Sequence, residues 1–319
     1  MDLVSADWSV KAERNLVSKP PSKEEVDRFL NEIGVGINGP GRYGLDSFRF
    51  ADLRRNGQLS LLLSSGRFGN FTSVIDKTVS GFEWRELPSG FGGADAEDVG
   101  SGRMAIVIPA QLTNYEGAMH CVATWPVIYA WTGTVYADAS RNFSLYYRRK
   151  LQSVKMQIAG NPPNEQGKAD CLKAEAAKIE RFLGNKTAGL DDALRWSRSR
   201  QGFRHGLYQR AFAVGILDDI GTPEAMKCLK ELAAERDPEV AIPAENDIVS
   251  KLGYLHTPPA KKALEGIASH RGEYGGGGLA KSFLLTWNQG TPTPDGTPET
   301  TLIPFSALNR PSAKPTQAK

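Results

Sequence analysis

The chain has 319 residues, of which 40% are hydrophobic, 24% charged and 9% aromatic. This composition is typical of a folded globular protein and excludes a fibrous or wholly disordered chain. The 39 lysines and arginines only slightly outnumber the 36 aspartates and glutamates, so the net charge of +3 does not by itself predict nucleic-acid binding.

Two further features bear on the compartment. No run of about 18 apolar residues occurs, so no membrane span is expected. Residues 1–10 lack the basic stretch and apolar core of an export signal. The sequence therefore predicts a cytoplasmic protein if Met1 is the native start, or a periplasmic or secreted one whose leader was removed. Cys121, Cys171 and Cys228 are odd in number and widely spaced, which argues against a disulfide framework and a zinc site.

The chain changes character near residue 150. Short apolar runs rich in Gly, Ser, Thr and Val give way to long Ala, Leu, Lys and Glu stretches with helical spacing. We therefore predict an α+β protein with two domains, a propeller-like antiparallel β domain followed by an α-helical solenoid. The predicted boundaries are a segment with a capping helix at 1–34, the β domain at 35–151, the helical domain at 165–287 and a disordered Pro- and Thr-rich tail at 288–319.

A helix is predicted near the start of the chain. Ser22 precedes Glu25 by three residues, which is the spacing of a capping box. Val26 and Phe29 then fall on one face, and Gly34 supplies the left-handed residue that ends a helix.

The region that follows has the pattern of short strands. Alternating leucines predict a strand at 59–63, and residues 127–137 predict a hairpin around Thr132-Gly133. Two similar turns, at Asn56-Gly57 and Ser101-Gly102, lie 45 residues apart. That interval is typical of the blades of a β-propeller.

The first of these turns carries a family resemblance. Residues 50–61 read Phe-Ala-Asp-Leu-Arg-Arg-Asn-Gly-Gln-Leu-Ser-Leu. They resemble the FG-GAP/VCBS type of propeller repeat, whose motif runs Asp-Leu-Asn-Gly-Asp-Gly-Lys-x-Asp-Leu. The resemblance implies a calcium ion held by loop oxygens, with Asp52 and Asn56 as candidate ligands. Arg54 and Ser60 depart from the motif, and the alternative is a turn that only orients a strand.

The β region has room for two or three blades of about 40–50 residues. A closed propeller typically needs at least about four blades. We therefore expect either a partial stack of sheets or a ring that another chain completes.

The second half repeats itself. Residues 222–233 and 257–268 share Thr, Pro, Ala, Lys, Leu and a second Ala at a shift of 35 residues. Each Thr-Pro step predicts a helix start, with threonine as N-cap and proline in the first turn. The pattern resembles HEAT-like repeats of the kind found in phycobilin lyase-type proteins. This resemblance implies a solenoid of stacked helix pairs that binds another macromolecule.

A basic and aromatic stretch supplies the candidate partner-binding residues. Guanidinium groups beside aromatic rings bind phosphates and stack on bases. In the alternative interpretation, the tryptophan packs between helices and the arginines form a solvated face, which the low net charge favours. The candidates are Arg195, Trp196, Arg198, Arg200, Arg204, His205 and Arg210.

No catalytic motif emerges, since the chain lacks a Gly-x-Ser-x-Gly elbow and a His-Glu-x-x-His sequence. The pairs Asp191-Asp192 and Asp218-Asp219 lie on predicted helices, and we interpret them as capping or surface charges. An enzyme would place its site between the domains. The nearest polar residues there are Asp95, Glu97, Asp98 and His120.

The sequence thus favours a non-enzymatic scaffold or adaptor that binds a macromolecular partner, foremost a protein, on the helical-repeat surface. The β loops add a second contact or a carbohydrate site in this interpretation. One alternative is a hydrolase with a carboxylate-lined site between the domains. The other is anion or nucleic-acid binding through Arg195–Arg210. No cofactor is expected apart from calcium at the turn described above.

Overall fold

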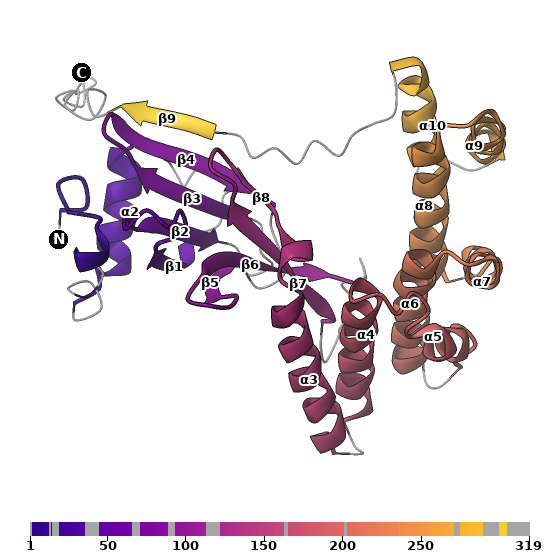
Figure 1. Cartoon of the computed structure of the whole chain (residues 1–319). Helices are drawn as coiled ribbons and strands as arrows, with labels where there is room; N and C mark the ends of the chain where they lie inside the picture. The colour runs from indigo at the N-terminus through magenta and orange to yellow at the C-terminus, as the bar shows by residue number, and fades with distance from the viewer. Residues whose placement is uncertain are drawn as a thin grey trace, which may run out of the picture. The chain divides into compact units, whose positions relative to one another are not determined.

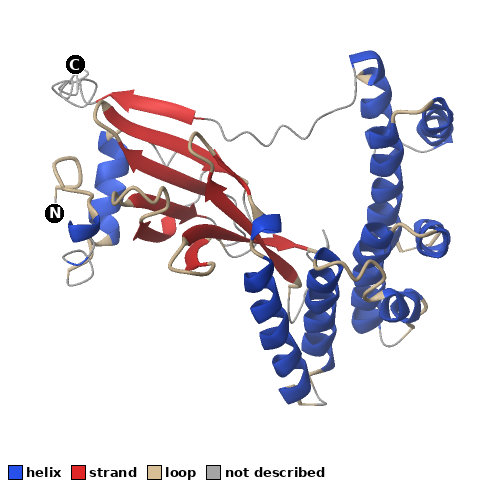
Figure 2. Ribbon diagram, viewed as in Figure 1, coloured by secondary structure: helices blue, strands red, loops and turns tan. Residues whose placement is uncertain are grey.

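The computed structural model falls into two compact units. The β unit comprises residues 1–110, 126–146 and 296–319, and the helical unit comprises residues 111–125 and 147–295. Both sheets lie in the first unit together with a helix near the N-terminus, and the second unit consists mainly of helices (Figure 2). The structure describes residues 2–12, 14, 19–35, 45–65, 71–88, 93–112, 122–162, 165–200, 203–235, 237–270, 275–289 and 300–304.

Two antiparallel sheets form the β unit, and in the described residues they do not close into a ring (Figure 1). The first sheet has the order β1-β2-β3-β4-β9, and the second has the order β5-β6-β7-β8. The predicted hairpin around Thr132-Gly133 is confirmed, because β7 and β8 pair as antiparallel neighbours. The strands are β1 (Leu45–Ala51), β2 (Ser60–Ser65), β3 (Phe71–Lys77), β4 (Gly81–Leu87), β5 (Asp95–Asp98), β6 (Met104–Gln111), β7 (Thr124–Trp131), β8 (Tyr136–Asp138) and β9 (Thr300–Pro304).

The first sheet is buried on both faces, and strand β2 shows why. Successive side chains of a strand point to opposite faces. Leu61 and Leu63 pack with the N-terminal segment and helix α2 (Lys23–Glu32), whereas Leu62 packs with residues of the second sheet. All three leucines are buried, so the run reads as continuous rather than alternating apolar sequence.

Helix α2 confirms the predicted capping box. The Ser22 hydroxyl accepts the Glu25 N–H, and the Glu25 carboxylate accepts the Ser22 N–H. Gly34 follows the helix with φ +78°, the left-handed conformation expected of a helix-ending glycine. Phe29 of this helix packs against Trp8 and Phe82, with ring centroids 5.7 and 5.1 Å away. The helix thereby covers the outer face of the first sheet.

A buried polar network lies between the two sheets. The Asp76 carboxylate accepts hydrogen bonds from Ser60, Tyr136 and Arg85, the last at 2.7 Å. Burial raises the pKa of Asp76, while Ser60, Arg54 and Arg85 act in the opposite direction. Both Asp76 and Arg85 are almost fully buried. The hydrogen bonds and ion pair between them and their neighbours therefore have to offset the free-energy cost of removing these charges from water.

The helical unit contains eight α-helices in its described residues, and the first begins just inside the β unit. None of the described helices has the length and apolar character that crossing a bilayer requires. The bounds are α3 (Ser144–Gly160), α4 (Gln166–Phe182), α5 (Leu190–Ser197), α6 (Phe203–Ile220), α7 (Pro223–Ala233), α8 (Pro238–Leu255), α9 (Pro258–His270) and α10 (Gly276–Leu285), with short 3-10 turns at Ser140–Asn142 and Trp287–Gln289.

From α5 onward the helices lie in two layers, with α6, α8 and α10 in one and α5, α7 and α9 in the other (Figure 1). Helices α7 and α9 both begin at a Thr-Pro step. Thr222 accepts the Ala225 N–H at 3.3 Å, and Thr257 accepts the Ala260 N–H at 3.4 Å. Leu229 and Leu264, which are 35 residues apart, are both fully buried. The recurring sequence therefore corresponds to recurring helix pairs.

The structure differs from the sequence-based expectations in the C-terminal tail and in the cysteines. Within the predicted disordered tail at 288–319, Thr300–Pro304 form β9 and pair with β4. The number and spacing of the cysteines argued against a disulfide framework, yet Cys171 is disulfide-bonded, while Cys228 is a free buried thiol. Spacing failed here because it does not determine which cysteines the fold brings together.

Candidate functional site: a charged pocket in the helical unit

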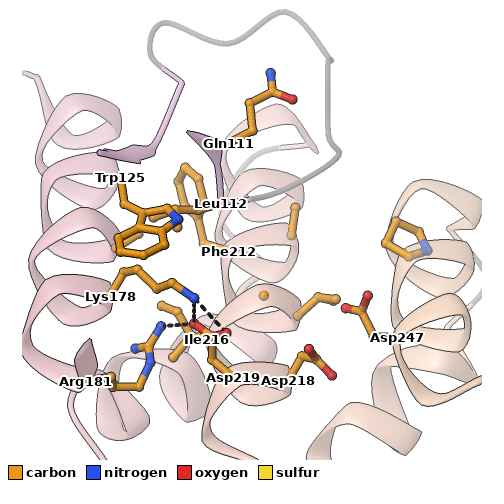
Figure 3. A pocket seen from close by; sticks show the side chains of 15 residues that line it. Gln111, Leu112, Trp125, Lys178, Arg181, Phe212, Ile216, Asp218, Asp219 and Asp247 are labelled. Atoms are coloured by element: carbon orange, nitrogen blue, oxygen red, sulfur yellow. Dashed lines mark hydrogen bonds and ion pairs between the residues drawn. The ribbon is translucent and has the colours of Figure 1, made fainter. Parts of the chain in front are cut away.

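A pocket of about 200 Å³ opens among helices α4, α6 and α8 and the ends of strands β6 and β7 (Figure 3). Each helix contributes residues spaced three or four apart, which share one helix face. The lining residues are Gln111, Leu112, Trp125, Ala174, Lys178, Arg181, Ala211, Phe212, Val214, Gly215, Ile216, Asp218, Asp219, Pro243 and Asp247.

Both cationic side chains of the pocket are held by Asp219. Lys178 Nζ lies 2.9 and 2.7 Å from the two carboxylate oxygens, and Arg181 donates to Oδ2 at 2.8 Å (Figure 3). Arg181 also donates to the Ala188 carbonyl oxygen at 2.7 Å. Burial alone would raise the pKa of Asp219, but Lys178 and Arg181 together bring this pKa below its usual value. Asp219 therefore stays ionised and fixes both cations.

Asp218 has its own cation on the neighbouring helix. Lys251 Nζ lies 3.1 Å from Asp218 Oδ1 and donates to the Asp218 carbonyl oxygen at 2.6 Å. Burial raises the pKa of Asp218, and Lys251 opposes this shift. Lys251 thus joins α8 to the C-terminal end of α6, where a cation also complements the helix dipole.

Asp247 is the carboxylate of the pocket without a counterion. Among the described residues, none gives it a hydrogen bond or an ion pair. Burial, followed by the charge of Asp218, raises the pKa of Asp247 to about 7, with Asp219 adding to the shift and Lys251 opposing it. Near neutral pH this carboxylate is consequently half protonated and available to a cation that enters the pocket.

An aromatic wall closes one side of the pocket. The Trp125 ring packs against Tyr147 and Phe182, with centroids 5.9 and 5.4 Å away. Lys178 Nζ lies 5.1 Å from the Trp125 ring centroid, within the range of a cation–π contact. Trp125 is thereby held in place by an aromatic cluster and a cation, so its face forms a fixed boundary of the cavity.

The predicted calcium turn has its acidic group engaged by its own backbone. Asp52 Oδ1 accepts the Asn56 N–H and Oδ2 accepts the Gly57 N–H, each at 3.1 Å. Asn56 Oδ1 accepts the Gln58 N–H at 3.0 Å. Among the described residues no group of three or more metal-ligating side chains occurs. These contacts favour the turn that orients a strand, and calcium at this turn stays a prediction.

The basic stretch is dispersed over α5, the loop after it and α6. Trp196 is only 2% exposed and packs on Phe212, with ring centroids 6.0 Å apart, so its face is closed to a base. Of the four arginines in this stretch whose side chains the structure describes, three form an ion pair with an acidic residue. The side chains of Arg204 and His205 lie outside the described residues. Arg195 pairs with Asp192, Arg200 with Glu235 and Arg210 with Asp237, while Arg198 is exposed.

Three of the four polar residues considered for an enzyme are engaged within the β unit. Asp95 pairs with Arg49 at 2.8 Å, and Glu97 accepts the Tyr146 hydroxyl at 2.9 Å. Asp98 accepts the Gly100 N–H at 2.8 Å. His120 lies outside the described residues.

Sequence reasoning missed the pocket. It interpreted Asp218 and Asp219 as capping or surface charges, whereas the structure places both in the pocket wall. The available signal was the helical spacing of Lys178 and Arg181, which places two cations on one face of α4. Asp247 carried no signal of its own, because its counterpart residues lie on other helices.

Comparison with known proteins gives no match, neither to a family model nor to a curated protein nor to a solved structure.

Proposed function

We propose that the protein is a non-enzymatic adaptor whose helical unit binds a macromolecular partner, and that the pocket receives a lysine or arginine side chain of that partner. The observation that carries this proposal is Asp247, a pocket carboxylate without a counterion among the described residues. Lys178 and Arg181 are held by Asp219, and Lys251 is held by Asp218, so among the described residues an ionised Asp247 is left without a direct ion pair and attracts a cation.

The size of the pocket favours a side chain over a whole small-molecule substrate. Its volume of about 200 Å³ is below the roughly 300–1,000 Å³ of pockets that enclose drug-sized ligands. Its lining includes no serine, threonine, cysteine or histidine among the described residues, and so offers no such nucleophile. In this proposal the apolar stem of the entering side chain packs on the aromatic wall at Trp125 and its charged end meets Asp247.

Exposed apolar side chains on the same unit support a macromolecular partner. Ile242, Tyr254 and Leu255 of α8 and Leu285 of α10 are all exposed, Leu285 by 83%. Exposed apolar residues of this kind are typical of a surface that another protein covers.

Binding of model ligands tests the proposal. The full chain is titrated with acetyl-arginine amide, acetyl-lysine amide and acetyl-citrulline amide, the last being a neutral analogue of arginine. Trp125 fluorescence and NMR report binding. We expect dissociation constants of about 1 mM for the two cations, as a single side chain supplies only about 4 kcal/mol, and no saturable binding of citrulline.

The variants Asp247→Asn and Glu265→Gln provide the matched comparison, because Glu265 is exposed on α9. Asp247→Asn is expected to weaken cation binding at least fivefold, and Glu265→Gln to leave it unchanged. Equal binding of citrulline and arginine, or an unchanged affinity in Asp247→Asn, contradicts the proposal.

A second candidate function is hydrolysis, with Asp247 as general acid or base. It is favoured by one observation, the pKa of Asp247 near 7, which suits proton transfer at neutral pH. Turnover of nitrophenyl glycosides or esters by the full chain, lost in Asp247→Asn but kept in Glu265→Gln, would support an enzyme over an adaptor.

The finer architecture is also part of the proposal. We propose that the helical unit is HEAT-like, supported by paired helices that recur with the 35-residue sequence repeat. We propose that the two sheets are blade-like, supported by β1–β4 and β5–β8, each of which follows chain order across its sheet.

The disulfide at Cys171 favours an oxidising compartment, and we propose a periplasmic or secreted location. The proposal predicts that the denatured chain from native cells titrates fewer thiols before reduction than after it. Equal numbers before and after reduction would favour the cytoplasm.

A further inference from the structure

Helix α3 carries a surface that the pocket does not use. Only Tyr147 and Val154 of this helix are buried. An apolar groove of about 510 Å³ runs along its exposed side and is bounded by Leu183, which follows α4. The groove is lined by Arg148, Leu151, Gln152, Lys155, Met156, Ala159 and Leu183.

The spacing of the lining residues matches the contact stripe of a packed helix. Arg148, Gln152, Met156 and Ala159 follow one another at intervals of four, four and three residues, and so share one helix face. Met156 at the middle of this stripe is 62% exposed. A stripe of this kind is what one helix presents to another in helix-in-groove recognition.

The charge of α3 selects the chemistry of the occupant. The helix contains Arg148, Arg149, Lys150 and Lys155 but no aspartate or glutamate. Lys150 pairs with Glu175 and Lys155 with Glu180, at 3.5 and 2.6 Å. Among the described residues, none forms an ion pair with Arg148 or Arg149. Arg148, which lines the groove, and Arg149, which follows it in the same helix, therefore lack counterions in the part of the chain that the structure describes.

We propose that this groove docks an amphipathic helix of a partner protein, in which acidic residues flank an apolar stripe. The apolar side chains of the partner cover Met156 and Ala159, and its carboxylates meet Arg148 and Arg149. This surface is separate from the Asp247 pocket, so either proposal stands without the other.

A synthetic helix of about five turns, with leucines at helical spacing and flanking glutamates, is the probe. A twin peptide carries glutamine in place of each glutamate. Fluorescence anisotropy with the full chain measures binding of both. We expect the acidic peptide to bind at micromolar concentrations, with affinity falling as salt rises, and the neutral twin to bind at least tenfold more weakly.

Met156→Glu is expected to weaken binding of the acidic peptide at least tenfold. Met156→Leu keeps nearly the same side-chain volume and should bind the peptide normally. Val79→Glu is the matched control, because Val79 is fully exposed and lies in the turn between β3 and β4 of the β unit. Circular dichroism melts check that each variant is folded. Normal peptide binding by Met156→Glu, or equal loss in Val79→Glu, overturns the proposal.

Two other occupants are outcomes of the same experiment. Binding of phosphatidylglycerol vesicles that depends on Met156, without binding of the peptide, replaces the protein partner with a lipid surface and overturns the proposal. Self-association of the full chain that Met156→Glu abolishes, measured by sedimentation, assigns the groove to a second copy and also overturns it.

Discussion

Replacing Asp247 with asparagine tests the electrostatics of the pocket directly. The folded chain keeps a proton on Asp247 up to about pH 7, whereas the unfolded chain loses it near 3.8. Stability therefore falls as pH rises from about 4 to about 7, because the unfolded state gains by ionising first. The shift corresponds to at most about 4 kcal/mol, and partial exposure with solvent screening reduces this to about 1–2 kcal/mol.

The variant removes this penalty without changing the shape of the side chain. We expect the free energy of unfolding of Asp247→Asn to exceed that of the native chain by about 1–2 kcal/mol at pH 8. At pH 4.5 the two free energies should be nearly equal. Urea unfolding followed by far-ultraviolet circular dichroism measures both values. Glu265→Gln, on an exposed helix face, should show no such pH dependence. A gain in stability that is the same at both pH values would refute the assignment of the raised pKa to Asp247.

Three further changes test the packing and the helix starts, each measured by thermal or urea unfolding. Gly253→Ala places a methyl group against an aromatic ring of α10 and is expected to cost about 1–3 kcal/mol, whereas Gly266→Ala, on open helix surface, should stabilise by about 0.5–1 kcal/mol; the reverse order would contradict this packing. Asp76→Asn leaves the buried Arg85 guanidinium with too few partners and should lower the free energy of unfolding by about 3–5 kcal/mol. A loss below about 1 kcal/mol would indicate that water reaches the network. Thr222→Ala and Thr257→Ala should each cost about 1 kcal/mol, and clearly unequal losses would argue against equivalent helix starts.

Local signals in the sequence were sufficient for the elements that depend on neighbouring residues. The capping box at Ser22 and the Thr-Pro helix starts at Thr222 and Thr257 form as expected, because each cap joins groups three residues apart. The 35-residue recurrence likewise corresponds to helix pairs, since equivalent leucines must be buried in equivalent places.

Features that depend on distant residues were not predictable in this way. No pattern in the sequence indicates that Asp219 forms ion pairs with Lys178 and Arg181, because both lie about forty residues earlier on another helix. Strand β9 was missed because proline-rich flanks mark a segment as irregular, although the Thr-Thr-Leu-Ile core of that strand has high β propensity. A strand that pairs with a partner more than two hundred residues away is specified by the sheet edge rather than by its own neighbours.

The return of the chain to strand β4 makes the helical unit an insertion into the β unit rather than an appendage. A shortened chain that stopped after α10 would remove β9 and bare the N–H and C=O groups along the outer side of β4. Bare strand edges recruit strands from other molecules. Truncation before β9 would thus replace an intramolecular strand pairing with an edge that promotes aggregation. An affinity tag should therefore follow Pro304 and leave β9 intact.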